Sequence, residues 1–146
     1  MEKILNSEYK INDEINKIDV NRVTDMLKEA YWSKGIGIDE VKKGITNSAL
    51  IVTAYTLRDI PVGFSRVISD KTRFAYILDV YVDKSHRKKG IGQGMIDFIL
   101  KHPELKDVYQ WLLATQDAHG VYGKLGFKQL ANPEKWMEIR YSRPER

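Results

Sequence analysis

The sequence predicts a single α+β domain that spans residues 1–146. Short runs of β-branched and aromatic residues, typical of strands, mix with segments whose apolar residues recur at helical spacing. No internal repeat and no Pro/Gly/Ser-rich linker divides the chain. A chain of 146 residues is long enough for one full core, because about two-thirds of the unfolded surface becomes buried at this size.

The N-terminal part of the chain predicts one short strand and two helices. Residues 9–11 favour the strand. Asp19 is a typical N-cap for a helix through about residue 30, since Val23 and Leu27 then lie on one face. The second helix is predicted over residues 39–47 by the same spacing of apolar residues.

Three strands are predicted next. Residues 49–55 and 62–69 are apolar runs joined by a turn of moderate length, which indicates a hairpin. Residues 76–82 are aromatic and β-branched, and only Asp79 interrupts the run. This third run therefore predicts a buried strand.

The C-terminal part predicts a helix and two more strands. Residues 90–101 carry Ile91, Met95 and Phe98 on one helical face. An apolar strand is predicted over residues 108–113, and a last strand over residues 136–141. The helix between residues 90 and 101 then supplies a crossover between strands.

A basic, glycine-containing turn joins the strand at 76–82 to the following helix. Glycine at 90 and 92 lets the backbone approach a ligand closely, because no Cβ shields the amides. The first amides of a helix have no internal partner and attract phosphate. Five basic side chains add positive charge to this turn: Lys84, His86, Arg87, Lys88 and Lys89. The turn therefore predicts an anion site.

The spacing of the turn excludes two common phosphate motifs. Met95 stands where the dinucleotide fingerprint requires glycine or alanine, and no Gly-Lys-Ser or Gly-Lys-Thr completes a P-loop. The turn does match the pattern Arg/Gln-x-x-Gly-x-Gly/Ala at residues 87–92.

In that pattern the sequence resembles the GNAT superfamily of N-acetyltransferases. A second segment, residues 114–127, is similar to the family's next helix with its Ala-x-x-Leu-Tyr-x-x-x-Gly-Phe signature, although Val121 replaces the leucine. The two motifs occur in the family's order and separation. The resemblance implies a twisted mixed sheet of six or seven strands flanked by about four helices, with acetyl-CoA as the acetyl donor.

The resemblance also implies which residues contact the coenzyme. The turn would hold the pyrophosphate, and the pantetheine arm would add to the preceding strand as a short extra strand. The implied coenzyme residues are Val80, Tyr81, Val82, Arg87, Lys88, Lys89, Gly90, Ile91 and Gly92. Thr115 stands where many members have an asparagine that contacts pantetheine. His119 reaches either the coenzyme or the substrate, or is a hydrogen-bonded surface group.

Two residues are candidates for proton transfer. Tyr122 matches the family's general acid, which protonates the coenzyme sulfur; the alternative is a core aromatic beside Phe127. Asp79, buried in its strand, would have the raised pKa that a base for an amine needs. The alternative is that Asp79 faces a wet cleft or pairs with a basic neighbour.

The remaining large aromatics suggest a pocket and a core. Tyr31 and Trp32 follow a helix into a glycine-flanked loop, the region that lines the acceptor pocket in related folds. An aromatic wall suits an aryl or cationic amine. Trp111 and Trp136 are expected to be core residues on strands.

The predicted function is an N-acetyltransferase that transfers acetyl to a primary amine by direct attack in a ternary complex, since the chain has no cysteine for an acyl-enzyme. The acceptor is a small molecule or a peptide. One alternative is a non-catalytic acyl-CoA sensor. The other, a nucleic-acid contact at residues 84–89, is disfavoured because no aromatic residues interleave with the basic ones.

Composition excludes several other classes. The three histidines have no metal-site spacing, so no metal is expected. The charged residues in the first thirty positions exclude a signal-peptide core, and no apolar stretch approaches membrane-spanning length, so a cytoplasmic protein is expected. A homodimer is common in the family. The basic tail is expected to be a solvated terminus, with Arg140, Arg143 and Arg146.

Overall fold

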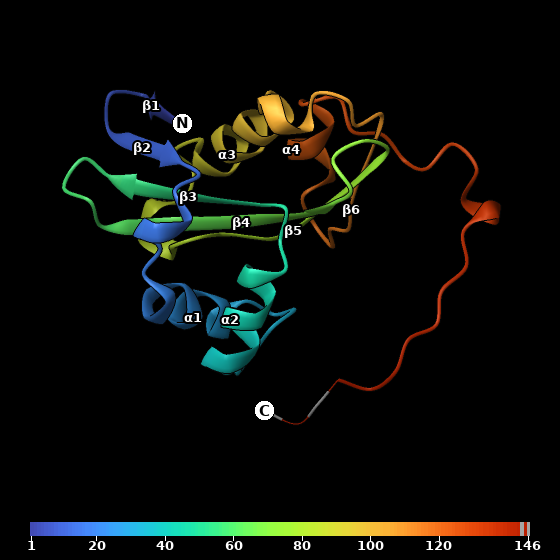
Figure 1. Ribbon diagram of the computed structural model, residues 1–146, viewed down its shortest axis with the longest axis horizontal. Helices are drawn as coiled ribbons and strands as arrows, with labels where there is room; N and C mark the ends of the chain where they lie inside the picture. The colour runs from blue at the N-terminus through green and yellow to red at the C-terminus, as the bar shows by residue number, and fades with distance from the viewer. Residues whose placement is uncertain (144, 146) are drawn as a thin grey trace.

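A computed structural model describes residues 1–143 and residue 145; Arg146 lies outside the described residues. These residues form one six-stranded sheet in sequential order (Figure 1). All neighbouring strands are antiparallel except the last pair, which is parallel. The strands are β1 (Glu2–Leu5), β2 (Tyr9–Asn12), β3 (Leu50–Thr56), β4 (Pro61–Ser69), β5 (Phe74–Val82) and β6 (Gln110–Leu113).

Four α-helices flank the two faces of the sheet (Figure 1). On one face lie α1 (Val20–Glu29) and α2 (Ile38–Thr46), and on the other α3 (Ile91–Leu100) and α4 (His119–Gly123). Single turns of 3₁₀-helix occur at Ile15–Lys17, Lys84–His86, Pro103–Leu105 and Pro133–Lys135. The predicted α+β fold, with a mixed sheet and four helices, is confirmed.

Local sequence signals account for the helix boundaries. The Asp19 side chain accepts a hydrogen bond from the Arg22 amide at 3.0 Å and so caps α1. Gly90 has a φ of 78°, a left-handed conformation that favours glycine, and α3 begins at the next residue. The predicted helices at 19–30, 39–47 and 90–101 therefore form within one or two residues of their expected ends.

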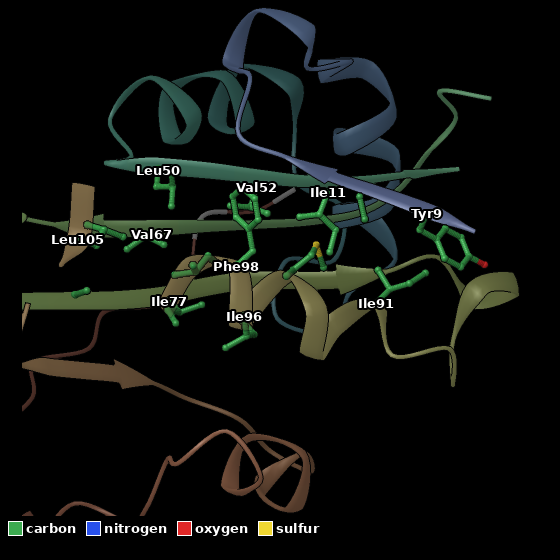
Figure 2. Packing of buried hydrophobic residues seen from close by; sticks show 14 of the residues in the cluster. Tyr9, Ile11, Leu50, Val52, Val67, Ile77, Ile91, Ile96, Phe98 and Leu105 are labelled. Atoms are coloured by element: carbon green, nitrogen blue, oxygen red, sulfur yellow. The ribbon is translucent and has the colours of Figure 1, made fainter. Parts of the chain in front are cut away.

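The sheet has a hydrophobic core on each face. On the α3 face, buried residues from the strands meet α3 (Figure 2). At the tightest contact, a Cβ added to Gly94 would lie 3.0 Å from Leu5 and 3.1 Å from Ile11, so α3 sits closely over β1 and β2. On the α1 and α2 face, the buried cluster includes Val23, Leu27, Val41, Phe64 and Tyr81.

Two expectations about the C-terminal segment are wrong, and one strand at the N-terminus was not predicted. The predicted last strand at 136–141 does not form, and Trp136, expected in the core, is 43% exposed. The alternating residues there suit a strand, but a strand also needs a hydrogen-bonded neighbour, which this segment lacks among the described residues. At the other end, β1 was not predicted, because its residues are mostly exposed and two of its four are charged.

Core packing should dominate stability, and β4 offers a test. Phe64 is fully buried, whereas Ile68 on the same strand is 39% exposed. Phe64→Ala should lower the free energy of unfolding by about 3–5 kcal/mol, because it removes a large side chain from a packed site. Ile68→Ala should lower it by much less. Urea denaturation followed by circular dichroism measures both, and equal losses would contradict this description of the core.

Candidate active site

The sheet opens at the C-terminal half of β5. The two parallel strands pair only over four positions, from Phe74 opposite Gln110 to Ile77 opposite Leu113. Past Ile77 the side of β5 that faces away from β4 has no strand neighbour among the described residues. Main-chain groups of Val80 to Val82 on this side are therefore available to an extended ligand, as in strand addition, except for the Val82 oxygen, which accepts a hydrogen bond from Arg87.

A second set of free main-chain groups lies directly after this strand. The first hydrogen bond of α3 runs from the Gly94 amide to the Gly90 oxygen at 2.9 Å. Within the described residues, the amides of Ile91, Gly92 and Gln93 donate to no protein group. Free amides at the positive end of a helix dipole are the groups that bind anions in proteins, so this end of α3 is a candidate anion site.

Distant residues hold the turn in place. The Asn6 side chain donates to the Lys89 carbonyl oxygen at 2.9 Å, and the Tyr9 hydroxyl lies 2.9 Å from Nδ1 of His86. Lys88 has a φ of 64°, which is unfavourable for a residue with a Cβ and so depends on such support. No local sequence signal identified Asn6 or Tyr9, because both lie about eighty residues away.

Arg87 is also turned toward the strand. Its Nε donates to the Val82 carbonyl oxygen at 2.9 Å, and its guanidinium lies 5.3 Å from the centre of the Tyr81 ring. At the start of the turn, Arg22 from α1 pairs with Asp83 at 2.6 Å. Arg87 therefore fixes the junction of strand and turn as well as adding charge.

A cleft of about 690 Å³ connects the strand edge, the turn and the start of α3. Eight of the nine coenzyme residues predicted for the strand and turn line it: Val80, Tyr81, Val82, Arg87, Lys88, Gly90, Ile91 and Gly92. Lys89, the ninth, is exposed but does not line the cleft. His119 lines a different cavity, beside β6.

An adjoining cavity of about 480 Å³ brings the two proton-transfer candidates together. Tyr122, Asp79 and Thr115 line it, although they come from α4, β5 and the segment after β6. The Thr115 hydroxyl accepts a hydrogen bond from the Ala118 amide at 3.1 Å and so supports the start of α4. Arg140, expected in a solvated tail, lines this cavity too.

Tyr122 is partly buried, with its ring 6.0 Å from that of Phe127. Burial raises the pKa of its phenol above the usual value of 10, because the charged phenolate loses hydration. The group is therefore a protonated donor at neutral pH. Tyr122 thus packs against Phe127, as the core alternative predicts, and it also lines the cavity.

Asp79 has its two carboxylate oxygens in separate interactions. Oδ2 pairs with Nε of Arg66 at 2.7 Å, and Oδ1 accepts from the Trp32 indole at 2.9 Å. The φ of Asp79 is 56°, where the register of β4 and β5 also shifts. Of the two alternatives left by the sequence, the structure displays pairing with a basic neighbour. The sequence did not point to Arg66, or to Ser48 to which Arg66 donates a hydrogen bond. Arg66 reaches Asp79 only because β4 pairs with β5, and no local pattern shows that pairing.

Tyr31 and Trp32 border both cavities. Their rings meet edge to face at 5.0 Å, and Trp32 also meets Tyr81 at 6.5 Å. The Arg143 side chain donates to the main-chain oxygen of Trp32. The loop thus forms one wall of the site, with Trp32 fixed and Tyr31 53% exposed.

The part of the chain that the structure describes has neither a metal-binding cluster nor a membrane-spanning helix. It contains no cluster of three or more His, Cys, Asp or Glu side chains that could bind a metal ion. None of its helices has the length and apolar character needed to cross a membrane.

Comparisons with known proteins identify the fold and the family. A family profile described as an acetyltransferase (GNAT) domain matches residues 47–129. A Xanthomonas campestris structure assigned to the GNAT acetyltransferases is 32% identical, with a TM-score of 0.85 over 92% of this chain and 93% of that one. A Staphylococcus aureus protein described as a probable acetyltransferase is 26% identical, with a TM-score of 0.73 over 91% and 99%.

A more distant structure shares the fold alone. Glucosamine-6-phosphate N-acetyltransferase from Arabidopsis thaliana is 18% identical, with a TM-score of 0.66 over 93% of this chain and 97% of that one. No curated protein sequence matches the chain. The profile covers more than half of the sequence, and the Xanthomonas structure aligns over nearly all of it. The chain therefore belongs to the GNAT acetyltransferase family.

Proposed function

We propose that the protein transfers the acetyl group of acetyl-CoA to a primary amine by direct attack in a ternary complex. The single observation that carries this proposal is the meeting of a free strand edge on β5 with the free amides of α3 in one cleft. This arrangement suits a long ligand with an amide-containing arm and a diphosphate. Membership of the family supports acetyl transfer in general.

The coenzyme would lie along the cleft in two parts. Its pyrophosphate accepts hydrogen bonds from the amides of Ile91 and Gly92, with Lys88 adding positive charge. Its pantetheine arm pairs with the main chain of Val80 to Val82. Lys89, which does not line the cleft, attracts the negatively charged pyrophosphate from a distance. Thr115 lies where the pantetheine arm would approach the second cavity.

The reaction then needs a polarised carbonyl and a proton donor. A main-chain N–H of β5 polarises the thioester carbonyl, and the neutral amine attacks its carbon. The C–N bond forms, the C–S bond breaks, and the Tyr122 phenol donates a proton to the departing thiolate. The proton of the amine leaves to water, and water returns a proton to the Tyr122 phenolate before the next turnover. With no cysteine in the sequence, no acyl-cysteine intermediate forms.

Asp79 is assigned a positioning role. Its two oxygens already bind Arg66 and Trp32, so it fixes the indole against the site. The Arg66 guanidinium also binds Gly44 and Ser48, which connects α2 to this wall. Tyr31 and Trp32 then present an aromatic surface to the acceptor, which suits a cationic or aryl amine.

Coenzyme binding can be tested at Gly92. Gly92→Val places a branched side chain on the first turn of α3, where an added Cβ meets only Val82 at 3.9 Å, so the fold should persist. The dissociation constant for acetyl-CoA should rise at least tenfold by calorimetry, because the side chain obstructs the anion site. When free acetyl-CoA is present at a hundred times its dissociation constant, the free energy of unfolding of the wild-type protein should rise by about 2.7 kcal/mol.

The matched control is Gly120→Val on α4, where an added Cβ meets nothing within 4 Å and which lies outside the cleft. Its affinity for acetyl-CoA should equal that of the wild type. Absence of saturable binding by folded wild-type protein would remove the basis of the proposal.

The role of Tyr122 can be tested by Tyr122→Phe. The kcat measured by thiol release should fall by about 10²–10⁴-fold, while affinity for acetyl-CoA stays the same. The control Tyr109→Phe changes a tyrosine that is 72% exposed and should have no effect. Since the Tyr122 pKa is raised from 10, this acid should cause no loss of rate between pH 7 and 9. An unchanged kcat in Tyr122→Phe would exclude the phenol as the general acid. Wild-type protein that binds acetyl-CoA but acetylates no amine would instead favour the non-catalytic sensor.

The role of Asp79 can be tested by Asp79→Asn. We expect a raised KM for the amine with little change in kcat or in its pH profile, because the ion pair with Arg66 positions Trp32. Asp107→Asn, at an exposed site away from both cavities, is the control. A fall in kcat of about 10²–10⁴-fold with an altered pH profile would instead make Asp79 the base.

A further inference from the structure

Asp117 lies where the cleft and the second cavity meet. The residues that line both hollows are Tyr31, Trp32, Val80, Asp117 and Ala118. Asp117 is the only charged residue among these. In the proposed reaction the thioester and the amine come together at this junction, because the coenzyme runs along the cleft and Tyr122 lines the second cavity. A charge placed here acts directly on the acceptor.

The local backbone holds Asp117 at the junction. The Thr115 hydroxyl accepts a hydrogen bond from the Ala118 amide at 3.1 Å, which closes a turn around Asp117. The Ala118 oxygen accepts in turn from the Tyr122 amide at 3.1 Å. After burial and Tyr31, the charge of Asp117 is the next cause that raises the pKa of Tyr122. The carboxylate and the phenol therefore belong to one short segment and share one environment.

The charge of Asp117 is the unbalanced one in the second cavity. Asp79 and Arg140 are the other charged residues that line it. Asp79 is paired with Arg66 at 2.7 Å. Arg140 is paired with Glu138, also at 2.7 Å. In the part of the chain that the structure describes, the Asp117 carboxylate makes no hydrogen bond and no ion pair. The cavity is therefore negative as well as aromatic.

We propose that Asp117 binds a second positive charge on the acceptor, which makes the acceptor class an amine with another cationic group, such as a diamine. The cation at the junction pairs with the carboxylate, and the rings of Tyr31 and Trp32 beside it attract a cation through their faces. An acceptor that carries a carboxylate there meets a like charge. This inference rests on the proposed function and names the acceptor of the same site.

The chemistry of a carboxylate favours this binding role over that of a base. A negative charge beside an ammonium group stabilises its protonated form and raises its pKa. The amine that attacks the thioester must be neutral, so Asp117 would hinder it by binding it tightly. The same effect is an advantage for a second amino group, which stays charged and does not react. Asp117 therefore holds the non-reacting end of the acceptor.

A matched pair of acceptors tests the second charge. The kcat/KM of a diamine is compared with that of the monoamine of equal chain length. The wild type should prefer the diamine by about tenfold or more, because hydrogen bonds to charged groups contribute that much. Asp117 is exposed, so Asp117→Asn should fold. It should remove the preference by raising the KM of the diamine. The control Asp107→Asn, at an exposed site outside both hollows, should keep the preference.

Two kinetic results would overturn the proposal. One is an equal kcat/KM for the two acceptors in the wild type, or a preference for an acceptor with a carboxylate. The other is an equal fall in kcat for both acceptors in Asp117→Asn, with the preference retained, which would make Asp117 a base.

A binding measurement separates this inference from the proposed function. Choline is a quaternary ammonium compound with no amine to acetylate, and its neutral carbon analogue has the same shape. In calorimetric titrations of protein saturated with CoA, the Kd of choline should be lower than that of the analogue by about tenfold or more. Asp117→Asn should remove the difference. Protein that binds acetyl-CoA without discriminating between choline and the analogue would overturn the inference and leave the proposed function standing. Protein that binds no acetyl-CoA would overturn both.

Discussion

The separation of β5 from β6 is the constraint on which the candidate site depends. Four paired positions hold the two parallel strands together, and beyond Ile77 their hydrogen bonding stops. The main chain of β5 must then find partners elsewhere, because an unpaired edge is costly when it is shielded from water. A ligand that supplies amide groups satisfies this requirement, and the cleft runs along the same edge.

The left-handed backbone at Asp79 contributes to this opening. At that residue β5 loses register with β4, and the carboxylate is directed to Arg66 and Trp32. Such a conformation costs of order 1–3 kcal/mol for a residue with a Cβ. The ion pair and the indole hydrogen bond offset part of that cost. One residue therefore reshapes the strand and also fixes the aromatic wall formed by the loop after α1.

The sequence predicted the parts of this site that are encoded locally. Gly90, Gly92 and the basic residues before them define the turn, and Asp19 defines the start of α1, because capping and backbone freedom act over a few residues. The contacts of Asp79 could not be predicted, since Arg66 reaches it only after β4 pairs with β5. Residues 136–141 show the opposite limit: their alternating pattern predicted a strand, but no strand forms there, because a local pattern does not supply the hydrogen-bonded neighbour that a strand needs.

The hydrogen bond from Asn6 to the Lys89 carbonyl joins residues that are 83 positions apart in the chain. A contact of that separation carries a larger loop-closure cost than the contacts within a helix or a hairpin, so the final shape of the turn depends on the docking of the first hairpin beside α3. The glycine motif is therefore insufficient by itself. A change that displaces the first six residues removes the hydrogen bond that Asn6 donates to Lys89, so the phosphate turn then depends on residues that its own motif does not contain.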